Sequence, residues 1–250
     1  MSGRPREMAG LRGEPARIAL PAREATGLLL AGGDSSRMGF NKALVRVGGR
    51  TLVERTARLL EELTATVLIV SRDRSVAAGL PYPVVDSERP GVGPLAALAA
   101  GLSRCATPWA LVLACDLPLF PAALGAHMLA LATGQEAAVP GAGPGAPRGE
   151  APAGEANADG NPGGWEAVVP HWNGFWEPLA AVYARSCLPA IQDALARGEK
   201  RVTSFYGQVR VRPVREEEIR LFAPPAVAFF NVNTRSDLRA LQELAKLPGA

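Results

Sequence analysis

The sequence predicts a single α/β domain: a Rossmann-like three-layer sandwich in which helices cover both faces of a mostly parallel central sheet. Two observations predict it. Short apolar runs alternate with segments of helical pattern, which is typical of βαβ units and a parallel sheet. The chain has 250 residues, of which 48% are hydrophobic and 20% charged, and these values are ordinary for one large globular domain.

The first expected strand and the first expected helix frame a loop rich in glycine. Residues 26–31 (TGLLLA) form a short apolar run that ends in glycines, which predicts a buried strand. Between residues 51 and 63, apolar side chains recur at helical spacing and predict an amphipathic helix. These side chains are Leu52, Val53, Leu59, Leu60 and Leu63.

The same alternation continues to residue 139. Further buried strands are expected at 66–70 (TVLIV), 82–85 (YPVV), 109–114 (WALVLA) and 137–139. Helices are expected over 93–104 and 121–131. The first of these opens with Gly93-Pro94, and proline is well suited to the first turn of a helix.

Residues 141–164 contain only Gly, Pro, Ala and polar residues. Such a segment cannot offset its own ordering entropy, so we expect a disordered surface loop. An interdomain linker is the alternative, but the elements that follow are too few for a second domain and are expected to complete the same sheet. These elements are strands 166–170, 178–183 and 228–232, and helices 184–197 and 234–246. The domain therefore spans 26–246, and residues 1–25 are expected to be a disordered N-terminal extension.

Charge and composition exclude several classes of protein. The net charge is +3, and residues 1–25 supply +2 of it, so we expect no nucleic-acid partner. Three cysteines without a CxxC pair, and only two histidines, argue against a zinc site and fit a reducing cytoplasm. No apolar run is long enough to span a bilayer, so no membrane partner is expected.

A candidate phosphate-binding loop follows the first strand, from Leu30 to Lys42 (LAGGDSSRMGFNK). Its two glycines let the backbone approach a ligand and can present amides to an anion. Arg37 and Lys42 add positive charges that suit phosphate oxygens. The loop is neither a Walker A motif nor GxGxxG, and an ordinary glycine-rich turn is the alternative. Its place after the first strand of an α/β sheet favours a ligand site.

Two aspartates end strands at the same edge of the predicted sheet. Asp86 follows the strand at 82–85, and Asp116 follows the strand at 109–114. A carboxylate at that edge can hold Mg²⁺ against triphosphate oxygens. Each aspartate could instead only cap a turn, but two of them beside a phosphate loop favour ligand roles.

Two further motifs are open to two interpretations each. Gly91-Val-Gly-Pro94 is either a plain helix start or a loop that lies against a base or ribose. Asn231 and Asn233 alternate on the strand expected at 228–232 and would face the same side. Asn233 is then either a helix cap or, with Asn231, a contact to a polar acceptor.

Five motifs together resemble those of the molybdenum cofactor guanylyltransferases. They are Leu30-Ala-Gly-Gly-x-Ser-x-Arg-Met-Gly-x-x-Lys42, Gly93-Pro-Leu-Ala96, Cys115-Asp-x-Pro118, Glu177-Pro-Leu-x-Ala-x-Tyr183 and Asn231-x-Asn-Thr-x-x-Asp-Leu238. The resemblance runs from about residue 26 to 246. The first motif is shared with cytidylyl and sugar-nucleotide transferases, whereas the combination is more specific.

The resemblance implies transfer of GMP from GTP to Mo-molybdopterin with Mg²⁺ as cofactor. Pyrophosphate would be released and molybdopterin guanine dinucleotide formed. It also implies molybdopterin-loading proteins and target molybdoenzymes as partners. The sequence departs from the family at Ser71, where Asn is frequent, and at Asn41, where Asp is frequent.

The motifs and the resemblance together assign roles to individual residues. Catalytic roles are expected for Arg37, Lys42 and Asp116, and Asp116 would hold the metal. Nucleotide contacts are expected at Leu30, Ala31, Gly32, Gly33, Ser36, Lys42, Ser71, Asp86, Gly93, Pro94 and Asp116. Acceptor contacts are expected at Glu177, Pro178, Asn231 and Asn233.

The expected chemistry is in-line attack of an acceptor phosphate on the α-phosphorus of the nucleotide, without a covalent enzyme intermediate. Two alternatives stay open. One is a cytidylyl- or sugar-phosphate nucleotidyltransferase on the same fold. The other is a non-catalytic nucleotide-binding chaperone, which would release no pyrophosphate.

Overall fold

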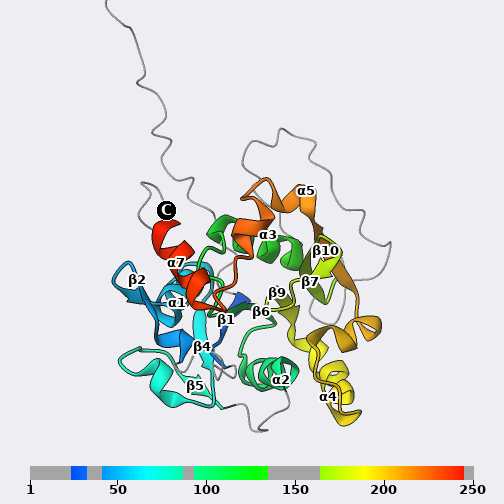
Figure 1. Cartoon of the computed structure of the whole chain (residues 1–250). Helices are drawn as coiled ribbons and strands as arrows, with labels where there is room; N and C mark the ends of the chain where they lie inside the picture. Colours follow the sequence, from blue (N-terminus) through cyan, green and yellow to red (C-terminus); the bar gives the residue numbers. More distant parts are fainter. Residues whose placement is uncertain (1–23, 33–40, 87–92, 135–163, 245–250) are drawn as a thin grey trace, which may run out of the picture.

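An eight-stranded sheet lies at the centre of the part of the chain that the computed structural model describes, residues 24–32, 41–86, 93–134 and 164–244 (Figure 1). The strand order is β10-β7-β9-β6-β1-β4-β5, and β8 pairs with β7. The strands are β1 (Ala25–Leu30), β4 (Thr66–Val70), β5 (Val84–Val85), β6 (Trp109–Ala114), β7 (Ala167–Trp172), β8 (Phe175–Trp176), β9 (Ala180–Ala184) and β10 (Val211–Arg215). A separate hairpin joins β2 (Arg46–Val47) to β3 (Arg50–Thr51).

The sheet is mostly parallel, as the alternating pattern predicts. β1 pairs in parallel with both β4 and β6, and only the pairings of β9 and β8 with their neighbours are antiparallel. Leu30 lies opposite both Val70 and Ala114. The carboxyl ends of three adjacent strands therefore meet at one edge, where open α/β sheets bind ligands.

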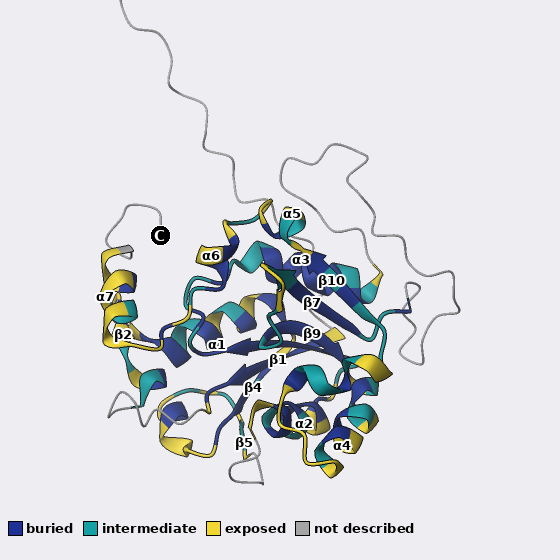
Figure 2. Ribbon diagram, turned by 45° about the vertical axis from the view of Figure 1, so that its right-hand side comes forward, coloured by how far each residue is buried: buried dark blue, intermediate teal, exposed yellow. Residues whose placement is uncertain are grey.

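Helices cover both faces of the sheet, which makes the three-layer sandwich (Figure 2). α1 and α3 pack on one face, while α2 and α4 lie on the other. The helices are α1 (Leu52–Leu63), α2 (Pro94–Arg104), α3 (Ala122–Thr133), α4 (Leu188–Ala196), α5 (Glu216–Ile219), α6 (Pro225–Ala228) and α7 (Arg235–Leu244). Short 3₁₀ segments are η3 (Lys42–Leu44), η4 (Arg74–Ala77), η5 (Arg185–Cys187) and η6 (Val202–Gln208).

Helix α1 shows how local sequence builds the layer beside β1. Thr51 caps its N-terminus: its Oγ1 accepts from Glu54 N at 3.2 Å, and Glu54 Oε2 accepts from Thr51 N at 2.6 Å. This reciprocal capping box satisfies two amides that the helix itself leaves unbonded. The apolar face, which includes Leu52, Val53 and Leu60, is fully buried, so α1 docks directly on the sheet.

Gly27 permits the close approach of α1 to β1. A Cβ at this position would lie 2.8 Å from Leu60 Cβ and 2.9 Å from Thr64 Oγ1. We therefore expect Gly27→Ala to lower the free energy of unfolding by about 1–3 kcal/mol, since the added methyl overpacks a filled core. Urea denaturation measures the change. Gly207→Ala is the matched control, because a Cβ there meets no atom within 4 Å, and it should change stability little. Equal values for both variants would show that the Gly27 contact relaxes at no cost.

Two predicted elements are corrected by the structure. The strand expected at 228–232 is wrong: α6 ends at Ala228, and residues 230–233 belong to no strand. Two consecutive prolines, Pro224 and Pro225, start the helical turn instead, since proline suits the first helical position. The outer strand is β10, in the stretch where no strand was expected. Its Pro213 is tolerated because, among the described strands, β10 pairs only with β7 and so lies at an edge.

Other boundaries shift only slightly. The strand expected from 82 is limited to the two residues of β5, and β1 starts at Ala25. The strand expected at 137–139, almost all of the 141–164 loop and residues 1–23 of the N-terminal extension lie outside the described residues.

Candidate active site

A cavity of about 340 Å³ opens at the carboxyl edge of β1, β4 and β6. Three segments that follow these strands form most of its wall. The lining residues are Leu30, Ala31, Gly32, Asn41, Lys42, Ala43, Ser71, Arg72, Asp73, Pro94, Ala97, Ala114, Cys115, Asp116 and Leu179. Of the expected nucleotide contacts, Leu30, Ala31, Gly32, Lys42, Ser71, Pro94 and Asp116 are therefore brought together. Gly33, Ser36 and Arg37 lie outside the described residues.

Lys42 and Asp116 form an ion pair in this cavity. Asp116 lies two residues beyond the end of β6, and Lys42 opens η3. Lys42 Nζ donates to Asp116 Oδ2, and their side chains are only 20% and 15% exposed. Lys42 Nζ also donates to Asn233 Oδ1 at 3.2 Å. Two of the three charged residues expected to be catalytic, Lys42 and Asp116, are thus in contact.

Asn231 lies on the other side of the same carboxylate. In the amide orientation that satisfies both groups, Asn231 Nδ2 donates to Oδ1 and Oδ2 of Asp116, each at 3.2 Å. The segment is held in place because Val232 N donates to the Asp116 carbonyl at 3.0 Å. Val232 is also buried against Val47, in a small apolar cluster beside α7. Asn231 and Asn233 thus reach the site together, although they do not lie on a strand.

The helix cap that follows belongs to Thr234. Thr234 Oγ1 accepts from Asp237 N at 3.1 Å, while Asp237 Oδ2 accepts from the backbone amides of Asn233 and Thr234 at 2.9 and 2.7 Å. The interpretation of Asn233 as the side-chain cap is therefore wrong. Its side chain is left to contact Lys42.

Ser71 ties the end of β4 to the end of β1. Its side chain is buried, Oγ donates to the Ala31 carbonyl at 3.0 Å, and Oγ accepts from Asp73 N at 3.2 Å. The hydroxyl therefore fixes the backbone of the cavity wall. Ser71 lines the cavity, and its contact with nucleotide stays a prediction.

Asn41 and Asp73 form a contact that the sequence did not indicate. Asn41 Nδ2 donates to Asp73 Oδ2 at 3.0 Å, and Asn41 Oδ1 accepts from Ala43 N at 3.1 Å, which caps η3. Hydrogen bonds from Ser75, then from Asn41, lower the pKa of Asp73. An ionised aspartate at position 41 has no N–H to donate and would face a second carboxylate. Asn41 thus orients the turn that presents Lys42.

Asp86 and Gly93, unlike Asp116, are not among the residues that line the cavity. Asp86 is exposed at the end of β5 and lines a neighbouring hollow of about 1020 Å³, not the cavity of Asp116. Gly93 precedes α2 with φ of +78°, and a Cβ there would lie 3.2 Å from the Lys200 carbonyl. Glycine is required by this backbone, which favours the helix-start interpretation of the motif.

Glu177 and Pro178 are not among the residues that line the cavity. Trp172 Nε1 donates to Glu177 Oε1 at 2.9 Å, and burial raises the pKa of Glu177. Tyr183 Oη donates to the Pro178 carbonyl at 2.9 Å. Leu179 from this motif does line the cavity. Acceptor contacts at Glu177 and Pro178 therefore stay predictions.

The donor set of the cavity fits a metal ion that is shared with a ligand. No cluster of three or more His, Cys, Asp or Glu side chains that could hold a metal occurs among the described residues. Asp116 and Asp73 are the carboxylates that line the cavity. Mg²⁺ is commonly bound by one or two carboxylates plus substrate phosphates, so Asp116 suits this ion once a nucleotide is present.

Cys115 is not a nucleophile. Burial, and then the charge of Asp116, raise the pKa of its thiol to about 12. The thiol therefore stays protonated near neutral pH, and only the thiolate is a strong nucleophile. The site supports direct transfer between two ligands better than a covalent enzyme intermediate.

The fold and the cavity define a nucleotide-binding α/β enzyme with a carboxylate and a lysine at the ligand edge of the sheet. Residues 27–212 match the family model described as a MobA-like NTP transferase domain. This chain belongs to that family, and it is a nucleotidyltransferase.

Individual relatives agree with this assignment. The chain is 35% identical to a probable molybdenum cofactor guanylyltransferase of Pelotomaculum thermopropionicum, over 89% of this chain and 94% of that protein. A solved structure of molybdopterin-guanine dinucleotide biosynthesis protein A from Archaeoglobus fulgidus shares the fold, with a TM-score of 0.65, 23% identity and coverage of 88% and 97%. The 2-C-methyl-D-erythritol 4-phosphate cytidylyltransferase of Thermus thermophilus also shares it, with a TM-score of 0.56, 18% identity and coverage of 88% and 98%.

In residues 24–244, apart from the gaps given above, no helix is both long and apolar enough to cross a membrane.

Proposed function

We propose that this protein transfers GMP from GTP to Mo-molybdopterin and releases pyrophosphate. The observation that carries the proposal is the meeting of Lys42, Asp116 and Asn231 in one cavity at the carboxyl edge of the sheet. The name shared by its relatives supports the guanylyl product. Three free, buried cysteines suit a reducing compartment, and we propose the cytoplasm.

In the proposed reaction, an oxygen of the acceptor's terminal phosphate attacks the α-phosphorus of GTP. A P–O bond forms there as the bond to the β-phosphate oxygen breaks, and pyrophosphate leaves with the electron pair. Lys42 stabilises charge on the phosphates, and Arg37 is proposed to assist it. Mg²⁺, held by Asp116, would supply Lewis-acid stabilisation of the phosphate oxygens.

The acceptor is proposed to approach from the side of Asn231 and Glu177. Asn231 orients the Asp116 carboxylate directly. Trp172, which bonds Glu177, stacks at 6.2 Å on Phe229, two residues before Asn231. The two motifs assigned to the acceptor are thus connected through one aromatic contact. Molybdopterin-loading proteins and target molybdoenzymes are the proposed protein partners.

Gly32 is proposed to contribute to the choice of GTP over CTP. A Cβ at Gly32 would meet no protein atom within 4 Å, and its φ lies outside the left-handed region that favours glycine. No residue that the structure describes therefore requires glycine at this place in the cavity wall. The absent side chain leaves room for the backbone to lie against a purine.

We expect Gly32→Ala to lower kcat/KM with GTP more than with CTP. The added methyl presses on the larger base and separates backbone groups from the guanine edge, at about 1–3 kcal/mol for each polar group left unpaired. Competition between GTP and CTP in one reaction, with the dinucleotide products separated by chromatography, measures kcat/KM for GTP relative to kcat/KM for CTP. The unmodified enzyme should form mainly the guanine dinucleotide. Mainly cytosine product would favour the cytidylyl alternative instead.

A further inference from the structure

Lys42 donates a hydrogen bond to the Asp116 carboxylate, the group that would hold a metal ion. Its Nζ donates to Asp116 Oδ2, while Asn231 reaches both oxygens of the same carboxylate at 3.2 Å. The Asp116 side chain is only 15% exposed. Lys42 therefore neutralises the charge of this carboxylate, and both carboxylate oxygens accept hydrogen bonds.

We propose that Lys42 is a built-in counter-ion that keeps divalent metal off Asp116 until a triphosphate draws the lysine away. Metal and triphosphate then bind as a coupled pair. The inference rests on the proposed function only for the kind of ligand, a nucleoside triphosphate with a divalent cation. It does not depend on which base or acceptor the enzyme uses.

A metal ion that arrives alone must displace an ammonium group and then remain beside it. Two like charges a few ångströms apart repel each other, and the ion gains no phosphate ligand in return. The metal therefore has little to gain from Asp116 while Lys42 is in place.

A triphosphate reverses this balance. It offers Lys42 several charged oxygens, and the ammonium sits on a flexible stem that can move towards them. Lys42 already has a second contact away from Asp116, at Asn233 Oδ1. Once Lys42 moves, Asp116 keeps the hydrogen bonds from Asn231, which would orient the carboxylate for a metal that also binds phosphate. Thermodynamic linkage requires the two ligands to raise each other's affinity by the same factor.

The test measures Mn²⁺ binding in the absence of any nucleotide, by the electron paramagnetic resonance signal of free Mn²⁺. Lys42→Met removes the charge and keeps an unbranched side chain. We expect it to bind Mn²⁺ roughly 10-fold more tightly than the unmodified protein, a factor typical of coupled sites. Lys42→Arg, which keeps the charge, should bind Mn²⁺ no more tightly than the unmodified protein. Adding Asp116→Asn to Lys42→Met should abolish the gain.

Arg46→Met is the matched control for the loss of one positive charge. Arg46 lies four residues along the chain, is exposed, and donates to the Gly49 carbonyl instead of a carboxylate. Its Mn²⁺ affinity should stay within about 2-fold of the unmodified protein, because exposed charges are well screened. Circular dichroism checks folding, and Lys42→Gln repeats the measurement if the methionine variant does not fold.

The proposal is overturned if neither uncharged Lys42 variant gains Mn²⁺ affinity, or if Arg46→Met gains as much. These measurements contain neither GTP nor pterin. A gain in Mn²⁺ affinity alongside absent GMP transfer would therefore retain the counter-ion and reject the proposed function. GMP transfer by the unmodified protein, without a gain in Mn²⁺ affinity in the Lys42 variants, would reject the counter-ion and retain the proposed function.

Discussion

Asp116→Asn is expected to lower the turnover number by about 10³-fold, since it removes a metal ligand and its Lewis-acid help from the reacting phosphates. Its volume and shape are kept. Stability should change by about 1 kcal/mol, because the asparagine oxygen can still accept a hydrogen bond from Lys42 Nζ. Steady-state kinetics at ordinary Mg²⁺ concentration and urea denaturation measure the two quantities.

Asp193→Asn provides the control for an amide in place of a carboxylate. The Asp193 side chain is more than half exposed and forms an ion pair with Arg197, one helical turn away. Asp193 has no role in the proposed reaction. Turnover of this variant should equal that of the unmodified enzyme. If Asp116→Asn also retains full turnover, Asp116 is only a turn residue and the metal assignment is wrong.

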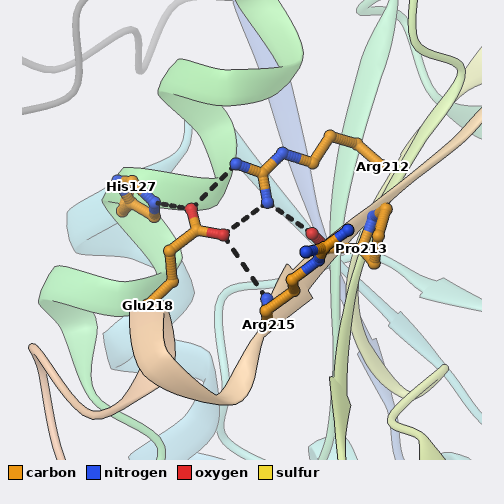
Figure 3. Close-up of polar contacts among 5 residues, drawn as sticks. All are labelled: His127, Arg212, Pro213, Arg215 and Glu218. Carbon is orange, nitrogen blue, oxygen red and sulfur yellow. Dashed lines mark hydrogen bonds and ion pairs between the residues drawn. The ribbon is translucent and has the colours of Figure 1, made fainter. Parts of the chain in front are cut away.

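A buried ion-pair network at β10, the strand at one end of the sheet order, gives the second large effect. Arg212, on β10, is buried and makes two hydrogen bonds to Glu218 of α5, at 2.5 and 2.9 Å. His127 Nε2, from α3, lies 3.1 Å from Glu218 Oε1. Figure 3 shows the three side chains converging from three elements. Glu218 therefore joins β10, α3 and α5.

We expect Glu218→Ala to lower the free energy of unfolding by about 3 kcal/mol, because it leaves the buried Arg212 charge without a partner. Glu216→Ala is the matched control: Glu216 pairs with exposed Arg220 one turn away, so its loss should cost less than about 0.5 kcal/mol. Urea denaturation of both variants gives the comparison. Replacing Arg212 and Glu218 together by leucine should cost less than Glu218→Ala, and the opposite order would reject the buried-charge explanation.

The same network makes the free energy of unfolding depend on pH. Burial raises the pKa of Glu218, but hydrogen bonds from His127 and Arg212 and the Arg212 charge outweigh it and lower the pKa to about 2. A depressed folded-state pKa contributes stability above the unfolded value of 4.5, and this stability is lost as pH falls from 4.5 towards 2. The stability difference between the unmodified protein and Glu218→Gln should therefore stay constant above pH 4.5 and shrink as the pH falls from 4.5 towards 2.

Elements with strong local signals were predictable. β6 is apolar along its whole length and is completely buried, and α1 carries both an amphipathic pattern and a capping box. β10 was missed because an edge strand buries only alternate residues, and Pro213 interrupts its strand pattern. The sequence contains no local signal that distinguishes it from an irregular segment.

The site was predictable where strand ends determine position. Lys42 and Asp116 meet because β1 and β6 are adjacent and parallel, so the segments that follow them share an edge. The spacing of Asn231 and Asn233 led to two side chains that do meet there, but through a strand that does not exist. The bond from Asn41 to Asp73 had no sequence signal, because it joins two loops whose approach only the folded chain establishes.

The most direct measurement of the central claim is pyrophosphate release from GTP by the purified protein, with and without Mo-molybdopterin, and from CTP under the same conditions. We expect release from GTP that requires Mo-molybdopterin and matches the guanine dinucleotide formed mole for mole, with far less release from CTP. GTP binding without any pyrophosphate release in the presence of Mo-molybdopterin would contradict it.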